Sequence, residues 1–101
     1  MPYVYANVKV KYGQLPAFFE QMVTIKRVME EHGWKLVGAW STLIGDLHEV
    51  HDLWEVEDAN TVPNAFAAAY EDPEFVAAAA QLGTIADREV LSLVAKTPYS
   101  P

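Results

Sequence analysis

The residues best able to do chemistry in this chain are gathered in one stretch, residues 34–58. This stretch contains all three tryptophans and two of the three histidines, and Asp52 lies two residues before Trp54. An aspartate held among apolar side chains can act as a general acid or base, because desolvation raises its pKa toward neutrality. The first chemistry to consider is therefore proton transfer by Asp52.

The spacing of the histidines argues against a histidine pair or a metal site. His48 lies four residues from Asp52 along a strand, roughly 13 Å away, so the two cannot share a hydrogen bond within one chain. His48 and His51 project to opposite faces, and His32 most simply interacts with the negative end of a helix dipole. The chain has no cysteine, no glycine-rich phosphate loop and no nucleophile elbow. We therefore expect no metal ion and no cofactor.

The stretch 34–58 itself predicts two strands joined by a tight turn at Gly45-Asp46, since glycine tolerates positive φ in such turns. Side chains alternate along a strand, so each strand contributes to two faces. One face carries the polar candidates together with apolar neighbours: Ser41, Val50, Asp52 and Trp54. The opposite face is also substantially apolar, so both faces of the sheet must be covered.

The rest of the chain completes a small α+β fold. Residues 3–11 alternate as a strand, with Val4, Ala6 and Val8 on one face. Helices are predicted at 15–32, ended by Gly33, at about 62–71, and at 73–82, stopped by Gly83; residues 89–96 form the last strand. This order predicts a single domain, 1–101, with a ferredoxin-like four-stranded antiparallel sheet and helices on one face. A second copy would cover the other face.

Composition limits the partners. The 101 residues are 51% hydrophobic and 21% charged, which is typical of a globular protein. The formal net charge of −7 repels phosphate backbones and anionic lipid surfaces, so we expect neither nucleic acid nor membrane as a partner. No apolar run is long enough to span a bilayer. The absence of cysteine fits a cytoplasmic protein.

Residues 36–58, LVGAWSTLIGDLHEVHDLWEVED, and the ending TPYSP resemble the NIPSNAP family of the dimeric α/β-barrel superfamily. The most specific matches are Gly38–Trp40, Ile44–Gly45, Leu53–Trp54 and Tyr99–Pro101. The resemblance implies a homodimer whose two sheets enclose a small-molecule pocket. NIPSNAP proteins have no generally agreed reaction, whereas related barrels include cofactor-independent monooxygenases, polyketide cyclases and haem-degrading enzymes.

The chain departs from its relatives at two positions. Members of the family commonly carry a histidine before the Leu-Trp pair, where this chain has Asp52. The haem-degrading relatives take their iron ligand from a histidine on the helical segment after the third strand. Residues 59–83 contain no histidine, so we expect no haem.

The resemblance places Asp52 and Trp54 inside the barrel, with Val50, Val4, Ala6 and Val8 as further substrate-binding residues and Ser41 as a nearby hydroxyl. The residues alone leave open that the valines face the helices instead. Asp52 would then be an acid or base acting on a small apolar or aromatic carbonyl compound. The alternative is that Asp52 is hydrogen-bonded to Ser41, a backbone N–H or a tyrosine. It would then be structural, in a non-catalytic hydrophobic-ligand-binding or protein-interaction module, so enzymatic activity stays open.

Overall fold

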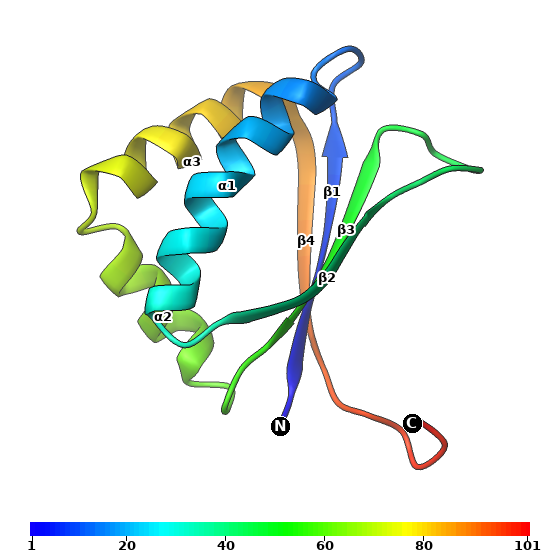
Figure 1. Ribbon diagram of the computed structural model, residues 1–101, viewed down its shortest axis with the longest axis vertical. Helices are drawn as coiled ribbons and strands as arrows, with labels where there is room; N and C mark the ends of the chain where they lie inside the picture. The colour runs from blue at the N-terminus through cyan, green and yellow to red at the C-terminus, as the bar shows by residue number, and fades with distance from the viewer.

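The computed structural model describes residues 1–101 as a four-stranded antiparallel sheet with three helices on one face (Figure 1). The strands are β1 (Tyr3–Val10), β2 (Lys35–Ser41), β3 (Glu49–Glu55) and β4 (Ala86–Val94). The helices are α1 (Leu15–Glu31), α2 (Thr61–Ala69) and α3 (Pro73–Ile85). The strand order is β2-β3-β1-β4, with the two central strands β3 and β1 paired directly. The predicted ferredoxin-like α+β fold is confirmed.

Of the two glycines predicted to end helices, Gly33 does so and Gly83 does not. Gly33 has a φ of +96° and ends α1, and the Asp72 carboxylate accepts a hydrogen bond of 2.9 Å from the Glu74 N–H at the start of α3. The prediction that Gly83 stops α3 is wrong, because the helix continues to Ile85. Leu82 and Ile85 pack against a buried apolar cluster, which offsets the low helix propensity of glycine.

A turn at Gly45-Asp46 implies that Ala39 pairs with Asp52 and Ser41 with Val50, and the structure has both pairs. The tight two-residue turn is wrong, because the strands end at Ser41 and Glu49 and a longer loop joins them. Within this loop the Asp46 carboxylate accepts a hydrogen bond from the His48 N–H and forms an ion pair with Lys9. These local contacts compete with continued strand pairing.

The register also shifts between Leu36 and Gly38, so that Leu36 pairs with Trp54. This irregularity inserts Val37 as an extra residue. Leu36 consequently packs against the core beneath the helices, and Val37 is 52% exposed. Strict alternation along β2 would place each of these two side chains on the other face of the sheet.

The core lies between the sheet and the helices, and it contains the residues predicted to line the interior of the barrel. Val4, Ala6, Val8, Val50, Asp52 and Trp54 are all buried on this side. Their expected position between two sheets is therefore wrong. The physical reason is that the opposite face of β1 and β3 carries most of the polar side chains of these strands. The apolar face of α1, which includes Phe18, Val28 and Met29, is buried against the more apolar side.

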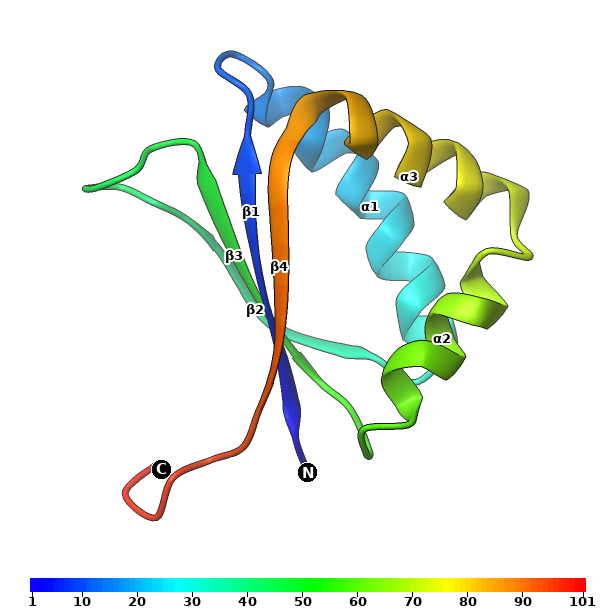
Figure 2. The ribbon, with the colours of Figure 1, turned by 180° about the vertical axis from the view of Figure 1, so that it is seen from behind.

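The opposite face of the sheet has no helix over it (Figure 2). Exposed apolar side chains on this face include Trp40 at 57%, Val90 at 45% and Val94 at 41%. The three helices also lack the length and apolar character needed to cross a membrane.

Candidate functional site

Asp52 sits in the middle of the helix-covered face with a small residue on each side. Its partner in β1 is Ala6 and its partner in β2 is Ala39. A methyl side chain on both neighbouring strands leaves space beside the carboxyl group that larger residues would fill. The local sequence thus creates room around the one buried charged residue of the core.

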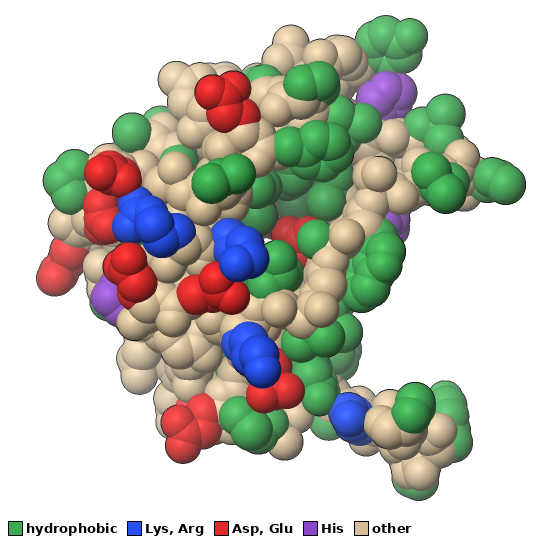
Figure 3. All heavy atoms as spheres, viewed as in Figure 1, with side chains coloured by type: hydrophobic (Ala, Val, Ile, Leu, Met, Phe, Trp, Pro, Cys, Tyr) green, Lys and Arg blue, Asp and Glu red, His purple; other side chains and the backbone are tan.

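Two cavities adjoin Asp52. One, of about 360 Å³, lies between the sheet and helices α1 and α3, and 14 of its 19 lining residues are hydrophobic. The other, of about 190 Å³, lies between α1 and strands β2 and β3. Met22 and Asp52 line both cavities. Figure 3 shows the hollow between α1 and the sheet, surrounded by hydrophobic side chains with acidic atoms at its base.

The Asp52 carboxyl group has no hydrogen-bond partner in the protein, although the residue is only 4% exposed. The alternative contacts to Ser41, a backbone N–H or a tyrosine are not formed. The pKa of Asp52 is raised from its ordinary value of 3.8 to about 6, mainly because burial desolvates the carboxyl group and also because of the nearby charge of Glu89, while His51 opposes the shift. Asp52 therefore exchanges a proton close to neutral pH.

Glu89 is a second carboxyl group in the larger cavity. It is an exposed residue of β4, opposite Val8 of β1, and desolvation of its carboxyl group by the surrounding protein raises its pKa as well. Glu89 is not predictable as a site residue from the sequence, because its position beside the site depends on the pairing of the first and last strands. The cavity therefore combines an apolar wall with two carboxyl groups whose pKa values are both raised.

Trp34 forms part of the wall of the same cavity and was also missed. Its ring packs edge-to-face against Trp54, at 5.6 Å between centroids, and against Phe66 at 5.2 Å. The residue is 3% exposed, and its indole Nε1 is itself completely enclosed and has no hydrogen-bond partner. Such an unsatisfied donor costs about 1–3 kcal/mol. The one available signal was a tryptophan directly after the helix-ending Gly33.

The structure separates the predicted site residues into three groups. Ala6, Val8, Asp52 and Trp54 line the larger cavity, and Val50 lines the smaller one beside Asp52. Val4 is packed in the core next to Trp54 and lines neither cavity. Ser41 is exposed at the end of β2 and also lines neither.

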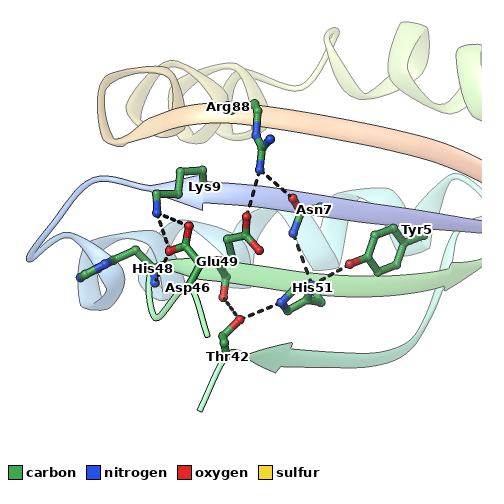
Figure 4. A network of polar contacts seen from close by, with 9 residues as sticks. All are labelled: Tyr5, Asn7, Lys9, Thr42, Asp46, His48, Glu49, His51 and Arg88. Atoms are coloured by element: carbon green, nitrogen blue, oxygen red, sulfur yellow. Dashed lines mark hydrogen bonds and ion pairs between the residues drawn. The ribbon is translucent and has the colours of Figure 1, made fainter. Parts of the chain in front are cut away.

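His51, the residue before Asp52, lies on the open face of the sheet at the centre of a polar network (Figure 4). Its Nδ1 is 2.6 Å from the Tyr5 hydroxyl and 3.3 Å from the Asn7 amide nitrogen, and its Nε2 is 2.8 Å from the Thr42 hydroxyl. The Asn7 nitrogen can only donate, so Nδ1 accepts and Nε2 carries the proton. Arg88 extends the network by donating to Asn7 and to Glu49.

The titratable residues do not form a metal centre of the usual kind. No group of three or more His, Cys, Asp or Glu side chains is arranged to hold a metal ion. What the helix-covered cavity offers chemically is proton transfer by Asp52 in apolar surroundings.

Comparison with solved structures shows the fold. A NIPSNAP family protein of unknown function from Agrobacterium tumefaciens has a TM-score of 0.86 and 19% identity, covering 100% of this chain and 92% of that one. An uncharacterised NIPSNAP domain protein from Burkholderia xenovorans has a TM-score of 0.83 and 16% identity, covering 100% and 99%. A putative antibiotic biosynthesis monooxygenase from Nitrosomonas europaea has a TM-score of 0.72 and 10% identity, covering 95% and 98%.

Among curated proteins, none matches the sequence significantly. The NIPSNAP family model matches residues 4–101, nearly the whole chain. The matched residues include all three helices and the whole sheet except Tyr3. The chain belongs to the NIPSNAP family.

Proposed function

We propose that this protein binds a small apolar or aromatic carbonyl compound in the cavity of about 360 Å³, and that Asp52 acts on it as a general acid or base without a cofactor. The observation that carries the proposal is a buried carboxyl group without a hydrogen bond, facing an apolar cavity. A structural aspartate would be expected to have its hydrogen-bonding capacity satisfied.

The raised pKa of Asp52, about 6, supports the proposed chemistry. A general base works best when its pKa lies near the working pH, since it is then both available and basic enough. In the proposed step the Asp52 carboxylate removes a proton from the carbon next to the carbonyl group. The electron pair of the broken C–H bond forms a C=C bond, and the carbonyl oxygen becomes an enolate. The proton on Asp52 exchanges with water, and a proton from Asp52 is then returned to the carbon.

One structural neighbour is described as a putative antibiotic biosynthesis monooxygenase, which is compatible with an enzyme of this architecture. At 10% identity that likeness concerns the fold, and it carries no residue role to this chain. The support for catalysis therefore rests on Asp52 and its surroundings.

The second candidate function is a non-catalytic module that binds a hydrophobic ligand or another protein. The observation that favours it is the predominance of hydrophobic residues in the cavity wall. Such a wall retains an apolar molecule without any chemical step. In that case Asp52 would only orient the ligand.

We also propose that a second copy of the chain covers the open face of the sheet. This face exposes Trp40, Val90 and Val94 beside the polar network of His51, and each helix of the chain lies on the other side. Apolar side chains with a rim of satisfied polar groups are typical of subunit interfaces. Cytoplasmic location and the absence of nucleic acid or membrane partners stay predictions.

One measurement distinguishes the two candidate functions. The protein is incubated in D₂O with propiophenone, an aromatic ketone with exchangeable protons next to its carbonyl group, and loss of these protons is followed by NMR. The catalytic proposal predicts exchange faster than in buffer, and exchange at the buffer rate with Asp52→Asn. Binding of propiophenone without accelerated exchange would leave the non-catalytic module as the better account.

A further inference from the structure

Glu89 lies at the opening of the larger cavity, on the same face of the sheet as Asp52. It pairs with Val8 of β1, and Val8 is buried beneath the helices. Paired residues of antiparallel strands project to the same side of the sheet, so the Glu89 side chain is on the helix-covered face. The residue lines the cavity and is also exposed to solvent. A charged group of a ligand can therefore meet this carboxyl group and keep part of its own hydration.

The charges around this cavity are unbalanced. Three of its lining residues are acidic and one is basic: Asp52, Asp87, Glu89 and Arg88. The Arg88 guanidinium is already engaged on the open face of the sheet, where it donates to the Asn7 side chain at 3.2 Å and to the Glu49 carboxylate at 3.0 Å (Figure 4). No lysine or histidine lines the cavity. The cavity therefore presents negative charge that the chain itself does not neutralise.

Asp52 shows that this imbalance extends into the interior. The residue is 4% exposed and its carboxyl group has no hydrogen bond, yet its oxygens are not completely enclosed. Lys26 of α1 lines the smaller cavity beside Asp52, but its ammonium pairs with Glu30 at 2.7 Å. The charge of Glu89 acts on Asp52 and disfavours its ionised form. A positive charge from outside the chain would favour the ionised form of both carboxyl groups.

The wall of the cavity indicates what kind of cation fits. It is mostly hydrophobic and includes five aromatic residues, which are Trp34, Trp54, Phe66, Tyr70 and Phe75. An inorganic cation would lose its hydration among such side chains without receiving enough oxygen ligands. An organic ammonium group attached to an aromatic or apolar body matches both the acidic opening and the apolar interior.

We propose that the ligand of the larger cavity carries a protonated amine, which pairs with the Glu89 carboxylate at the opening while an aromatic or apolar body fills the interior. This inference rests on the proposed function of the cavity, and it makes the carbonyl compound an amino ketone. The Glu89 carboxylate positions the ligand through its ammonium group, and Asp52 is left free to exchange a proton with the carbon next to the carbonyl group. Amines are thereby selected over neutral and anionic molecules of similar shape.

The test uses the full chain and three probes that share a phenyl ring and a two-carbon arm: phenethylamine, propylbenzene and 3-phenylpropionate. Binding of each probe is measured by ligand-observed NMR at low ionic strength, where charge interactions are least screened. Glu89→Gln removes the carboxylate at the opening and keeps the size of the side chain. Glu55→Gln is the matched control, because Glu55 pairs with Tyr3 on the open face.

We expect Glu89→Gln to weaken phenethylamine binding by about tenfold, the loss of one charge-assisted contact that water partly screens. Glu55→Gln should leave phenethylamine binding unchanged. Propylbenzene should bind the wild type and both variants equally, because it has the shape of phenethylamine without the charge. The wild type should bind 3-phenylpropionate at least about tenfold more weakly than phenethylamine, because its carboxylate meets like charges.

Two results would overturn the role of Glu89: equal binding of phenethylamine by Glu89→Gln and the wild type, or binding of 3-phenylpropionate as tight as that of phenethylamine. Binding of propylbenzene in either case would leave the cavity proposal intact. Phenethylamine binding that depends on Glu89, without accelerated exchange of propiophenone, would support the amine and reject the catalytic step. Failure of the wild type to bind any of the three probes would overturn both proposals.

Discussion

His51 and Asp52 are consecutive residues of β3, yet their side chains lie on opposite faces of the sheet in opposite chemical settings. His51 hydrogen-bonds at both ring nitrogens, to Tyr5 and Asn7 on one side and to Thr42 on the other. Asp52 has no hydrogen bond and adjoins two cavities. One strand thus separates a satisfied polar network from a carboxyl group available for chemistry.

The first prediction concerns stability and pH. The pKa of Asp52 is raised in the folded state, from 3.8 to about 6, so protonated Asp52 favours the fold. Its contribution is fully present below pH 3.8 and is lost as pH rises through about 6. Asp52→Asn cannot ionise, so it should be more stable than the wild type above pH 6, by up to roughly 3 kcal/mol, and lose this advantage near pH 4. Chemical unfolding of both proteins from pH 4 to 8 measures this, and a clear loss of stability at pH 7 would identify Asp52 as a structural anion.

The second prediction concerns which cavity binds the ligand. Ala6 and Ala39 flank Asp52 on its two sides, and each lines a different cavity. Ala6→Val should weaken propiophenone binding by about tenfold or more, because its added methyl groups enter the cavity of about 360 Å³ and overpack it when occupied. Ala39→Val is the matched control and should bind propiophenone nearly as the wild type does. Titration of each protein with propiophenone, followed by NMR, measures the binding. The reverse pattern would assign the ligand to the smaller cavity.

Part of the fold and of the candidate site could be predicted from the sequence. Alternation correctly groups Val50, Asp52 and Trp54 on one face, and the glycine at 33 correctly ends α1. The side covered by the helices was not predictable, because apolar residues occur on both faces and strand patterns do not report which face a helix covers. The bulge at Val37 was not predictable either. A valine is as common in a regular strand as in a bulge, so its residue type gives no signal.

Glu89 and Trp34 were not predicted as site residues for a different reason. Asp52 lies on β3 and Glu89 on β4, and the two strands are neighbours of β1 on its opposite edges. Trp34 lies in the segment between α1 and β2 and lines the larger cavity. These relations are long-range in sequence and depend on how whole elements pack. Local periodicity contains no information about them, whereas Asp52 could be found from its own strand.

The third prediction concerns assembly. A second copy on the open face should give a dimer, about twice 11.3 kDa, at micromolar protein in sedimentation analysis. Val90→Glu places a charge on this face and should produce monomers, because an unpaired charge at an interface is costly to desolvate. Val76→Glu on α3 is the control, since Val76 is 43% exposed and Val90 is 45% exposed. A wild-type monomer, or a dimer that tolerates Val90→Glu, would contradict the proposed interface.

The fourth prediction concerns cofactors. Helices α2 and α3 contain no histidine, so the axial ligand expected from haem-degrading relatives is missing. Titration with hemin should therefore give weak, non-stoichiometric absorbance changes. A sharp Soret shift saturating at one hemin per chain would show that the protein binds haem through another ligand and would refute the cofactor-free proposal.

The central claim is that Asp52 is a buried carboxyl group with a pKa suited to proton transfer, and its titration in the folded protein tests this most directly. The side-chain carboxyl carbon is observed by ¹³C NMR in protein labelled at aspartate, and Asp52→Asn identifies its signal. Glu89→Gln should lower the pKa of Asp52, because it removes a like charge, whereas Glu55→Gln on the open face should have little effect. The account predicts a wild-type pKa of about 6, and a value at or below 3.8 would contradict it.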